Sequence, residues 1–347
     1  MLIEKFVWDL TYACPLRCTH CYSESGRRAA KTPPPEDLMK IAEIIVRSGA
    51  KRVSLSGGEP LLVRGWAEAA RRLRDAGIEV TLFTSGWIMD EAVAAEIGRS
   101  VSHVVVSLDG ATAATHDRLR QRSGSFDRAL AALVVLARAK REREARGEPT
   151  PGLGVDYTVV RSNMTETERF ASEITTALPG LDRVRFGMAI PEGPAADEGF
   201  AEGELLTEEE MLALIATEPR LVACAGNGVS VSVTDMRYYL PYSPYGTPGT
   251  RIAHLEPDGQ LRAFGVYEAK VGSVLDEPLE VLWDRALAWR HDPFVVEQIQ
   301  AIRSAQDWAR AARVLDRRYG SDEDKARIRL RLAREPGASQ PAADMAC

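Results

Sequence analysis

Short apolar segments alternate with longer amphipathic segments through the first 190 residues. The first apolar segment, Lys5 to Leu10, predicts a strand. Between Pro35 and Ser48, four apolar residues recur at the spacing of one helix face: Leu38, Ile41, Ala42 and Ile45. Prolines before this stretch and Gly49 after it are typical helix boundaries. The chain therefore begins with a strand–helix unit.

The same unit recurs along the chain. Strands are expected near 52–56, 79–84, 103–108, 154–160 and 183–187, and helices near 66–76, 90–98, 125–146 and 165–177. Six strands joined by helical crossovers indicate a parallel sheet. Parallel βα repeats can close or nearly close into a barrel, whose loops converge at the carboxyl ends of the strands. We therefore predict an α/β core over residues 1–190, with its chemistry on that face.

The pattern changes after residue 190. A loop and a helix that starts at Thr207 are expected over 191–222. Period-two alternation at 229–233 and a hairpin signal around Pro257-Asp258-Gly259 predict a small α+β appendage with antiparallel strands over 223–290. Apolar stripes predict helices over 291–334. The tail, 335–347, is expected to be disordered.

Charge and hydropathy narrow the possible partners and location. The formal net charge of −6 leaves no basic stripe for neutralising phosphates, so nucleic acid is not an expected partner. No run reaches the ~18 apolar residues of a membrane span. Glu4 stands where a secretion signal would need a basic start. We expect a cytoplasmic protein that does not bind membranes.

Three of the five cysteines lie within eight residues, in the loop after the first strand. Cys14, Cys18 and Cys21 form a C-x3-C-x2-C element. Three thiolates can hold three irons of a [4Fe–4S] cube and leave the fourth iron open to another ligand. Structural zinc usually takes four ligands in two pairs, and no second pair exists here, while His20 lies directly between two ligands. An iron–sulfur cluster is the favoured interpretation.

Three further motifs follow successive predicted strands: Ser56-Gly57-Gly58-Glu59-Pro60, Thr84-Ser85-Gly86 and Val106-Ser107-Leu108-Asp109-Gly110. Together with the cysteine triplet, they resemble the radical S-adenosylmethionine (radical SAM) superfamily over roughly residues 5–290. The resemblance implies a partial (β/α)6 TIM-like barrel that carries a small C-terminal appendage and C-terminal helices. It also implies two cofactors, one [4Fe–4S] cluster and S-adenosylmethionine (SAM).

The resemblance assigns SAM contacts to side chains and backbone of these motifs. Backbone at Gly57 and Gly58 would receive the methionine ammonium, with the charge of Glu59 nearby. Other contacts are implied for the ribose (Ser85), the methionine carboxylate (Ser107 and Arg120) and the adenine (His20 and Tyr22). Each assignment has a plainer alternative, because a glycine pair is a common turn, Ser107 could cap a helix, Arg120 could be solvated and Tyr22 could be packing.

The C-terminal part resembles a SPASM or twitch extension, which normally binds auxiliary clusters through several cysteines. Cys224 matches the first ligand position, but Arg262-Ala263-Phe264 stands where another cysteine is expected, and only Cys347 follows. We therefore expect a degenerate extension, a single cluster and a buried Cys224 without a ligand role. Four tyrosines, Tyr238, Tyr239, Tyr242 and Tyr245, are candidates for lining a substrate pocket or for packing.

The resemblance implies that a reduced flavodoxin or ferredoxin donates an electron, and that SAM yields a 5′-deoxyadenosyl radical. Only 13 residues precede Cys14, fewer than the peptide-recognition domain of many peptide-maturing members, so we expect a small-molecule substrate. The chain looks similar to the cytosylglucuronate decarboxylases of nucleoside-antibiotic biosynthesis, in which an Arg would hold the uronate. A dehydratase, an epimerase, a peptide-modifying maturase and a non-catalytic redox sensor remain alternatives. The sequence identifies no catalytic side chain.

Overall fold

The computed structural model describes residues 3–240 and 251–333. Its centre is one ten-stranded sheet in the order β10-β9-β8-β1-β2-β3-β4-β5-β6-β7. The first six strands are β1 (Lys5–Thr11), β2 (Arg52–Gly57), β3 (Glu79–Thr84), β4 (His103–Ser107), β5 (Gly152–Val159) and β6 (Arg183–Met188). They pair in parallel, in the order of the chain, within two residues of the predicted bounds. The predicted parallel α/β core is confirmed.

The predicted hairpin around Pro257-Asp258-Gly259 is confirmed, but other pairings of the later strands differ from the prediction. β7 (Ser230–Thr234) and β8 (Ile252–Leu255) were expected in a separate antiparallel unit. Instead, β7 pairs in parallel with β6, and β8 pairs in parallel with β1. Only the pairings of β9 (Gln260–Arg262) with β8 and with β10 (Lys270–Ser273) are antiparallel. The parallel run therefore has eight strands, because two segments of the C-terminal part add to its two edges.

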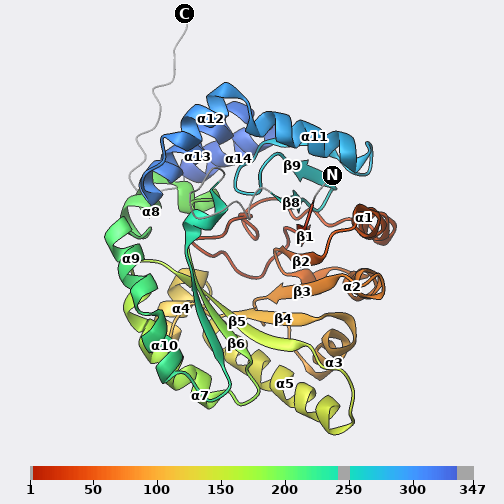
Figure 1. Cartoon of the computed structure of the whole chain (residues 1–347), viewed down its shortest axis with the longest axis vertical. Helices are drawn as coiled ribbons and strands as arrows, with labels where there is room; N and C mark the ends of the chain where they lie inside the picture. Colours follow the sequence, from red (N-terminus) through yellow and green to blue (C-terminus); the bar gives the residue numbers. More distant parts are fainter. Residues whose placement is uncertain (1–2, 241–250, 334–347) are drawn as a thin grey trace, which may run out of the picture.

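Helices connect the first strands along the outside of the sheet (Figure 1). They are α1 (Pro35–Ser48), α2 (Trp66–Asp75), α3 (Glu91–Ser100), α4 (Ala113–Arg120) and α5 (Ser125–Ala145). The helical stretch expected over 165–177 is broken into α6 (Thr167–Arg169), a π turn over Phe170–Ile174 and α7 (Thr175–Ala177). The short helix α4 was not predicted. It begins after Thr112, whose side chain accepts a hydrogen bond from the Thr115 amide.

The C-terminal helices form a layer beside β8 and β9 (Figure 1). They are α11 (Leu279–Arg290), α12 (Pro293–Gln300), α13 (Ala305–Tyr319) and α14 (Asp322–Leu332). Three more helices follow β6: α8 (Glu198–Gly203), α9 (Glu208–Ala216) and α10 (Glu218–Cys224). Thr207 and Glu210 form a capping box at the start of α9, as predicted. No described helix is long and apolar enough to cross a membrane. The predicted tail and Cys347 lie outside the described residues.

Candidate active site

One cavity of about 350 Å³ is lined by residues from all eight parallel strands. It contains Cys14, Cys18 and Cys21, and also Gly57 and Gly58. His20, Tyr22, Ser85, Ser107 and Arg120 line it as well. The structure therefore brings all but one of the predicted site residues to one cavity; the exception, Glu59, lies behind its wall. Their individual contacts with SAM stay predictions.

The cysteine loop is packed tightly against glycines. A Cβ atom at Gly58 would lie 2.2 Å from the carbonyl oxygen of Ala13, and one at Gly193 would lie 2.6 Å from that of Cys21. Gly57 has a φ of 101°, which L side chains rarely adopt. The amide of Gly58 also donates to Thr11 O at 2.7 Å. The glycine pair thus lets the cysteine loop lie directly on the end of β2, a reason for glycine that the sequence did not reveal.

The three thiols are near enough to influence one another. Burial raises the pKa of Cys14, and Cys18 and Cys21 raise it further. Burial also raises the pKa of Cys18 to about 11, although the Arg120 guanidinium opposes that shift. Among the described residues, no three Cys, His, Asp or Glu side chains are close enough to share one metal ion. A cube takes each thiolate at a different iron, so three cluster thiolates need not converge on one ion.

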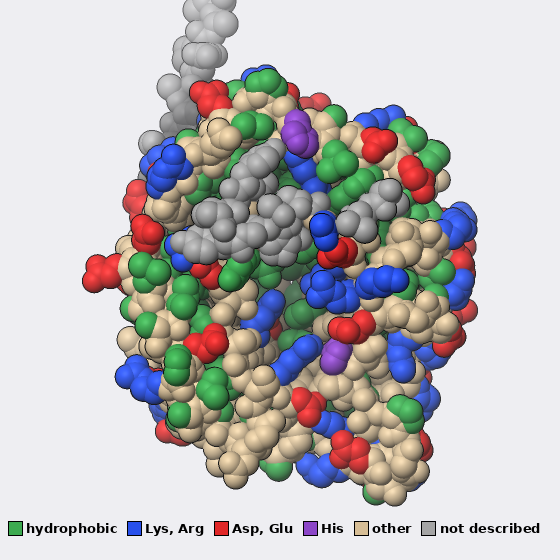
Figure 2. Space-filling model, viewed as in Figure 1, with side chains coloured by type: hydrophobic (Ala, Val, Ile, Leu, Met, Phe, Trp, Pro, Cys, Tyr) green, Lys and Arg blue, Asp and Glu red, His purple; other side chains and the backbone are tan. Residues whose placement is uncertain are grey.

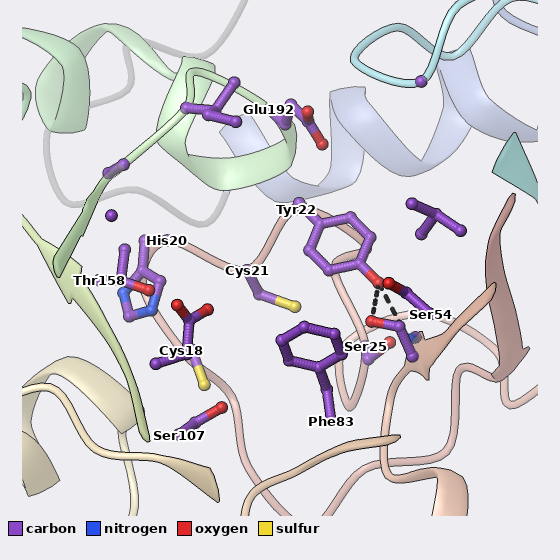
Figure 3. A pocket seen from close by; sticks show the side chains of 18 of the residues that line it. Cys18, His20, Cys21, Tyr22, Ser25, Ser54, Phe83, Ser107, Thr158 and Glu192 are labelled. Carbon is purple, nitrogen blue, oxygen red and sulfur yellow. Dashed lines mark hydrogen bonds between the residues drawn. The ribbon is translucent and has the colours of Figure 1, made fainter. Parts of the chain in front are cut away.

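Arg120 belongs to an ion-pair network behind the thiols. Its Nε lies 2.5 Å from Oδ2 of Asp109, which also lies 3.2 Å from Nε2 of His20. Asp109 is fully buried, and Arg120 and His20 hold the pKa of its carboxyl well below the usual range against the effect of burial. Arg120 is therefore buried in an ion pair, and the alternative of a solvated Arg120 is wrong. Figure 3 shows His20 and Cys18 together on one side of the cavity.

Tyr22 lies on another side of the cavity and connects three elements (Figure 3). Its hydroxyl donates to Oδ1 of Asp9 at 2.7 Å and accepts from the Gly57 amide at 2.9 Å. The other carboxylate oxygen of Asp9 is 3.0 Å from Nε2 of His254 on β8. The cysteine loop, β1 and the C-terminal part of the chain therefore meet at one buried polar network.

Glu59 is fully buried, and its carboxylate is occupied by nearby donors. It accepts from Oγ1 of Thr84 at 2.8 Å and from the amide and hydroxyl of Ser85 at 2.9 and 2.5 Å. It does not line the cavity. In this arrangement, Glu59 fixes the end of β3 and the hydroxyl of Ser85. Burial nevertheless raises the pKa of Glu59.

Two cationic residues, Lys5 and Arg185, also line the cavity, and the sequence analysis did not identify them. Arg185 on β6 makes two bonds to Asp156 on β5, at 2.6 and 2.9 Å, and the Tyr239 hydroxyl also contacts this guanidinium. Lys5 on β1 makes no ion pair or hydrogen bond through its ammonium group with any described residue. Burial and the neighbouring charges of Arg185 and Arg52 lower the pKa of Lys5 to about 8. Figure 2 shows a hollow in this face with several Lys and Arg side chains around it.

The helix α14 is tied to the cysteine loop by buried charges. Arg331 Nη1 donates to Oε2 of Glu24 at 2.6 Å, and Arg327 contacts the same carboxylate. Arg331 also makes two bonds to Asp197 before α8, at 2.7 and 2.8 Å. Glu24 itself has a φ of 53°. The last described helix thus holds the loop that carries the thiols. The sequence predicted a helix in this region but not its contact with the cysteine loop.

Cys224 and the tyrosines occupy different surroundings. Cys224 ends α10, and its thiol lies 3.5 Å from the carbonyl of Leu221. It is only partly buried, so the expectation of a fully buried residue was wrong. Tyr239 lines the cavity, whereas Tyr238 is 41% exposed and does not. Tyr242 and Tyr245 lie outside the described residues.

Comparisons with known proteins agree with this geometry. Residues 8–176 match the model of the Radical SAM superfamily. The AdoMet-dependent heme synthase of Methanosarcina barkeri is 35% identical over 137 residues, 38% of this chain and 38% of that protein. Mycofactocin maturase MftC of Mycobacterium tuberculosis is 31% identical over 182 residues, 49% of this chain and 44% of that protein. The alignments thus span less than half of these two relatives.

A solved structure shows the same fold. Streptococcus suis SuiB bound to S-adenosylmethionine superposes with a TM-score of 0.63 at 14% identity, over 84% of this chain and 66% of that one. Likeness at this identity concerns the fold alone. The family match over residues 8–176 covers a little less than half of the chain and includes the three-cysteine loop, and this match supports a [4Fe–4S] cluster and SAM as the cofactors.

Proposed function

We propose that this protein is a radical SAM enzyme that decarboxylates a nucleoside uronate, with cytosylglucuronate as the substrate. One observation supports an acidic substrate best. The cluster thiols and the cationic pair of Lys5 and Arg185 line the same cavity. A substrate carboxylate at Lys5 would give that ammonium group an ionic partner that no described residue provides.

The cofactors and the chain have separate tasks. When bound, the cluster and SAM supply a 5′-deoxyadenosyl radical that can take a hydrogen atom from a substrate. Cys14, Cys18 and Cys21 would hold the cluster, and the backbone at Gly57 and Gly58 would receive the methionine part of SAM. The cavity wall would exclude water and orient the uronate between the cluster and the cationic pair.

The proposed exchange is balanced. The carboxylate is replaced by hydrogen, R–COO⁻ + H⁺ → R–H + CO2, so one C–C bond breaks, one C–H bond forms and the exchange is redox neutral. Arg185 and Lys5 would hold the carboxylate before the bond breaks. Reduced flavodoxin or ferredoxin would supply the electron that cleaves SAM. The exchange stays redox neutral because the hydrogen atom taken from the sugar would return to the product, and that electron would be recovered as SAM is restored.

A second candidate is a peptide-modifying maturase. It is favoured by a relative, because the MftC protein that matches 49% of this chain is named as a maturase. A maturase would leave cytosylglucuronate unchanged. A redox sensor would bind the cluster without producing 5′-deoxyadenosine.

The deciding experiment is anaerobic incubation of reconstituted protein with SAM, dithionite and cytosylglucuronate, followed by mass spectrometry and CO2 measurement. The expected product is the substrate with its carboxylate replaced by hydrogen. Lys5→Met should weaken substrate binding about 10-fold, since a charge-assisted contact is lost, yet change binding of the decarboxylated product little. Lys51→Met, on the β2 side of the α1–β2 turn, is the matched control. Absence of product from the wild type would overturn the proposal.

A further inference from the structure

Glu192 is a buried carboxyl group in the cavity wall that no part of the mechanism above uses. It follows β6 and is the residue before the short 3-10 turn Gly193–Ala196. Its side chain is among the cavity-lining residues, and the residue is only 8% exposed. Figure 3 shows Glu192 and Tyr22 near each other, away from His20 and Cys18. The position is fixed by close packing of Gly193 on the cysteine loop.

The carboxyl group has no partner within the described part of the chain. The hydrogen bonds of this residue are made by its backbone: its amide donates to Ile190 O, and its carbonyl accepts from the Ala195 amide. Because the residue lines the cavity and its carboxyl group has no protein partner there, this group is available to a ligand bound in the cavity. Glu59 is the opposite case, because it is fully buried and its carboxylate is occupied by four donors.

The charge state of Glu192 restricts what it can bind. Burial raises its pKa to about 8; Arg262 opposes this shift, and Asp9, Glu268 and Asp316 reinforce it. The group is therefore mainly a neutral carboxylic acid at pH 7. A neutral acid presents one donor and one acceptor side by side. It complements a ligand edge on which an acceptor stands next to a donor.

Cytosine has such an edge, with its ring N3 as the acceptor and its exocyclic amino group as the donor. We propose that Glu192 is the residue that recognises the base of the substrate, through paired hydrogen bonds to N3 and the amino group of cytosine. This inference rests on the proposed function. Lys5 and Arg185 account for binding of the carboxylate, and Glu192 accounts for binding of the base. It assigns Glu192 a binding role and no bond-breaking step.

The layout of the cavity is consistent with this assignment. Lys5 opens β1, whereas Glu192 follows the end of β6, so the two groups lie toward opposite ends of the parallel strands. The lining also contains Phe264 and Val266, which offer apolar surface for a flat base. A uronate bound at Lys5 and a base bound at Glu192 would place the sugar between them, in the cavity that the thiols face.

The test uses three variants of the reconstituted holoenzyme. Glu192→Leu removes both hydrogen-bonding atoms, whereas Glu192→Gln keeps one donor and one acceptor. The control is Glu198→Gln, a change at an exposed position in α8. For each variant, kcat and KM are measured with cytosylglucuronate, and the Kd of SAM is measured by isothermal titration calorimetry.

The expected result is a rise of about 10-fold to 100-fold in KM for Glu192→Leu, the usual effect of losing a bidentate base contact. Glu192→Gln should stay within about 3-fold of the wild type, and Glu198→Gln should match it. A loss in Glu192→Gln as large as in Glu192→Leu would overturn the assignment, because it would require an ionisable acid. So would an effect confined to the Kd of SAM, which would place the adenine there.

The two proposals fail differently. If the wild type releases no CO2 from cytosylglucuronate, the proposed function is wrong and the base recognition falls with it. If the wild type turns over and Glu192→Leu has an unchanged KM, only the role of Glu192 is overturned. A small fall in melting temperature with unchanged KM would have the same meaning, since it would show a purely structural side chain.

Discussion

The guanidinium of Arg120 contacts one of the three predicted cluster ligands, because its Nη1 lies 3.7 Å from Sγ of Cys18. Nε of the same group is held at 2.5 Å by Oδ2 of the buried Asp109. A fixed positive charge that donates to a cluster sulfur stabilises the more negative, reduced form of the cluster. We therefore predict that Arg120 tunes the reduction potential of the cluster, in addition to its predicted contact with the methionine carboxylate.

Arg120→Gln should therefore lower the reduction potential of the cluster by tens of millivolts, since charge and hydrogen bonding at the sulfurs both decrease. It should also destabilise the fold by about 3–5 kcal/mol, because the buried Asp109 loses its guanidinium partner. An EPR-monitored redox titration and a melting curve measure the two effects. Arg118→Gln, on the exposed side of α4, is the control. An unchanged potential in a folded Arg120→Gln protein would contradict this role.

Cluster content should depend on three cysteines only. Anaerobically reconstituted protein should contain about four irons, as one cube requires. Replacing Cys14, Cys18 and Cys21 by Ala should abolish the cluster, whereas Cys224→Ala should leave it intact, because Cys224 lies at the end of α10 with its thiol on a backbone carbonyl. Iron analysis and the visible absorption spectrum measure this. Eight irons, or iron loss in Cys224→Ala, would show a second cluster.

Gly58→Ala should impair the cysteine loop itself. The added Cβ would lie 2.2 Å from the Ala13 carbonyl, so the loop must shift, at a cost of about 1–3 kcal/mol. We expect reduced iron content and reduced SAM binding together. Gly199→Ala is the matched control, since a Cβ there meets nothing within 4 Å. Full iron content with selective loss of SAM binding would instead support a direct ligand contact at Gly58.

Tyr239 should affect the substrate more than the cofactors. It lines the cavity and its hydroxyl contacts Arg185, which we assign to the carboxylate. Tyr239→Phe should raise KM for the uronate about 3-fold to 10-fold, because the hydrogen bond that orients the Arg185 guanidinium is lost. Tyr239→Ala separates packing from recognition. Equal losses of uronate turnover and of substrate-free SAM cleavage, with a lower melting temperature, would assign Tyr239 to packing.

The sequence predicted the first six strands because their apolar segments lie between clear helix patterns. The pairing of β7 and β8 could not be read in this way, since alternation at 229–233 shows a half-buried strand but not its neighbour. Motif spacing located the thiols and the glycine pair. It could not reveal Lys5 and Glu192, whose significance comes from burial in a cavity that only the tertiary structure creates. Glu59 is a further example, because the motif placed its charge near SAM, whereas its carboxylate lies behind the cavity wall and binds Thr84 and Ser85.

The pairing of β8 with β1 also has a consequence during synthesis. β1 carries the cysteine loop, and one of its edges has no partner until Ile252–Leu255 have left the ribosome. During that interval the loop is not yet held by α14, because Arg327 and Arg331 are made later still. We therefore expect iron and sulfide to reach the three thiols more readily on the nascent chain than after the C-terminal third has folded against the cysteine loop.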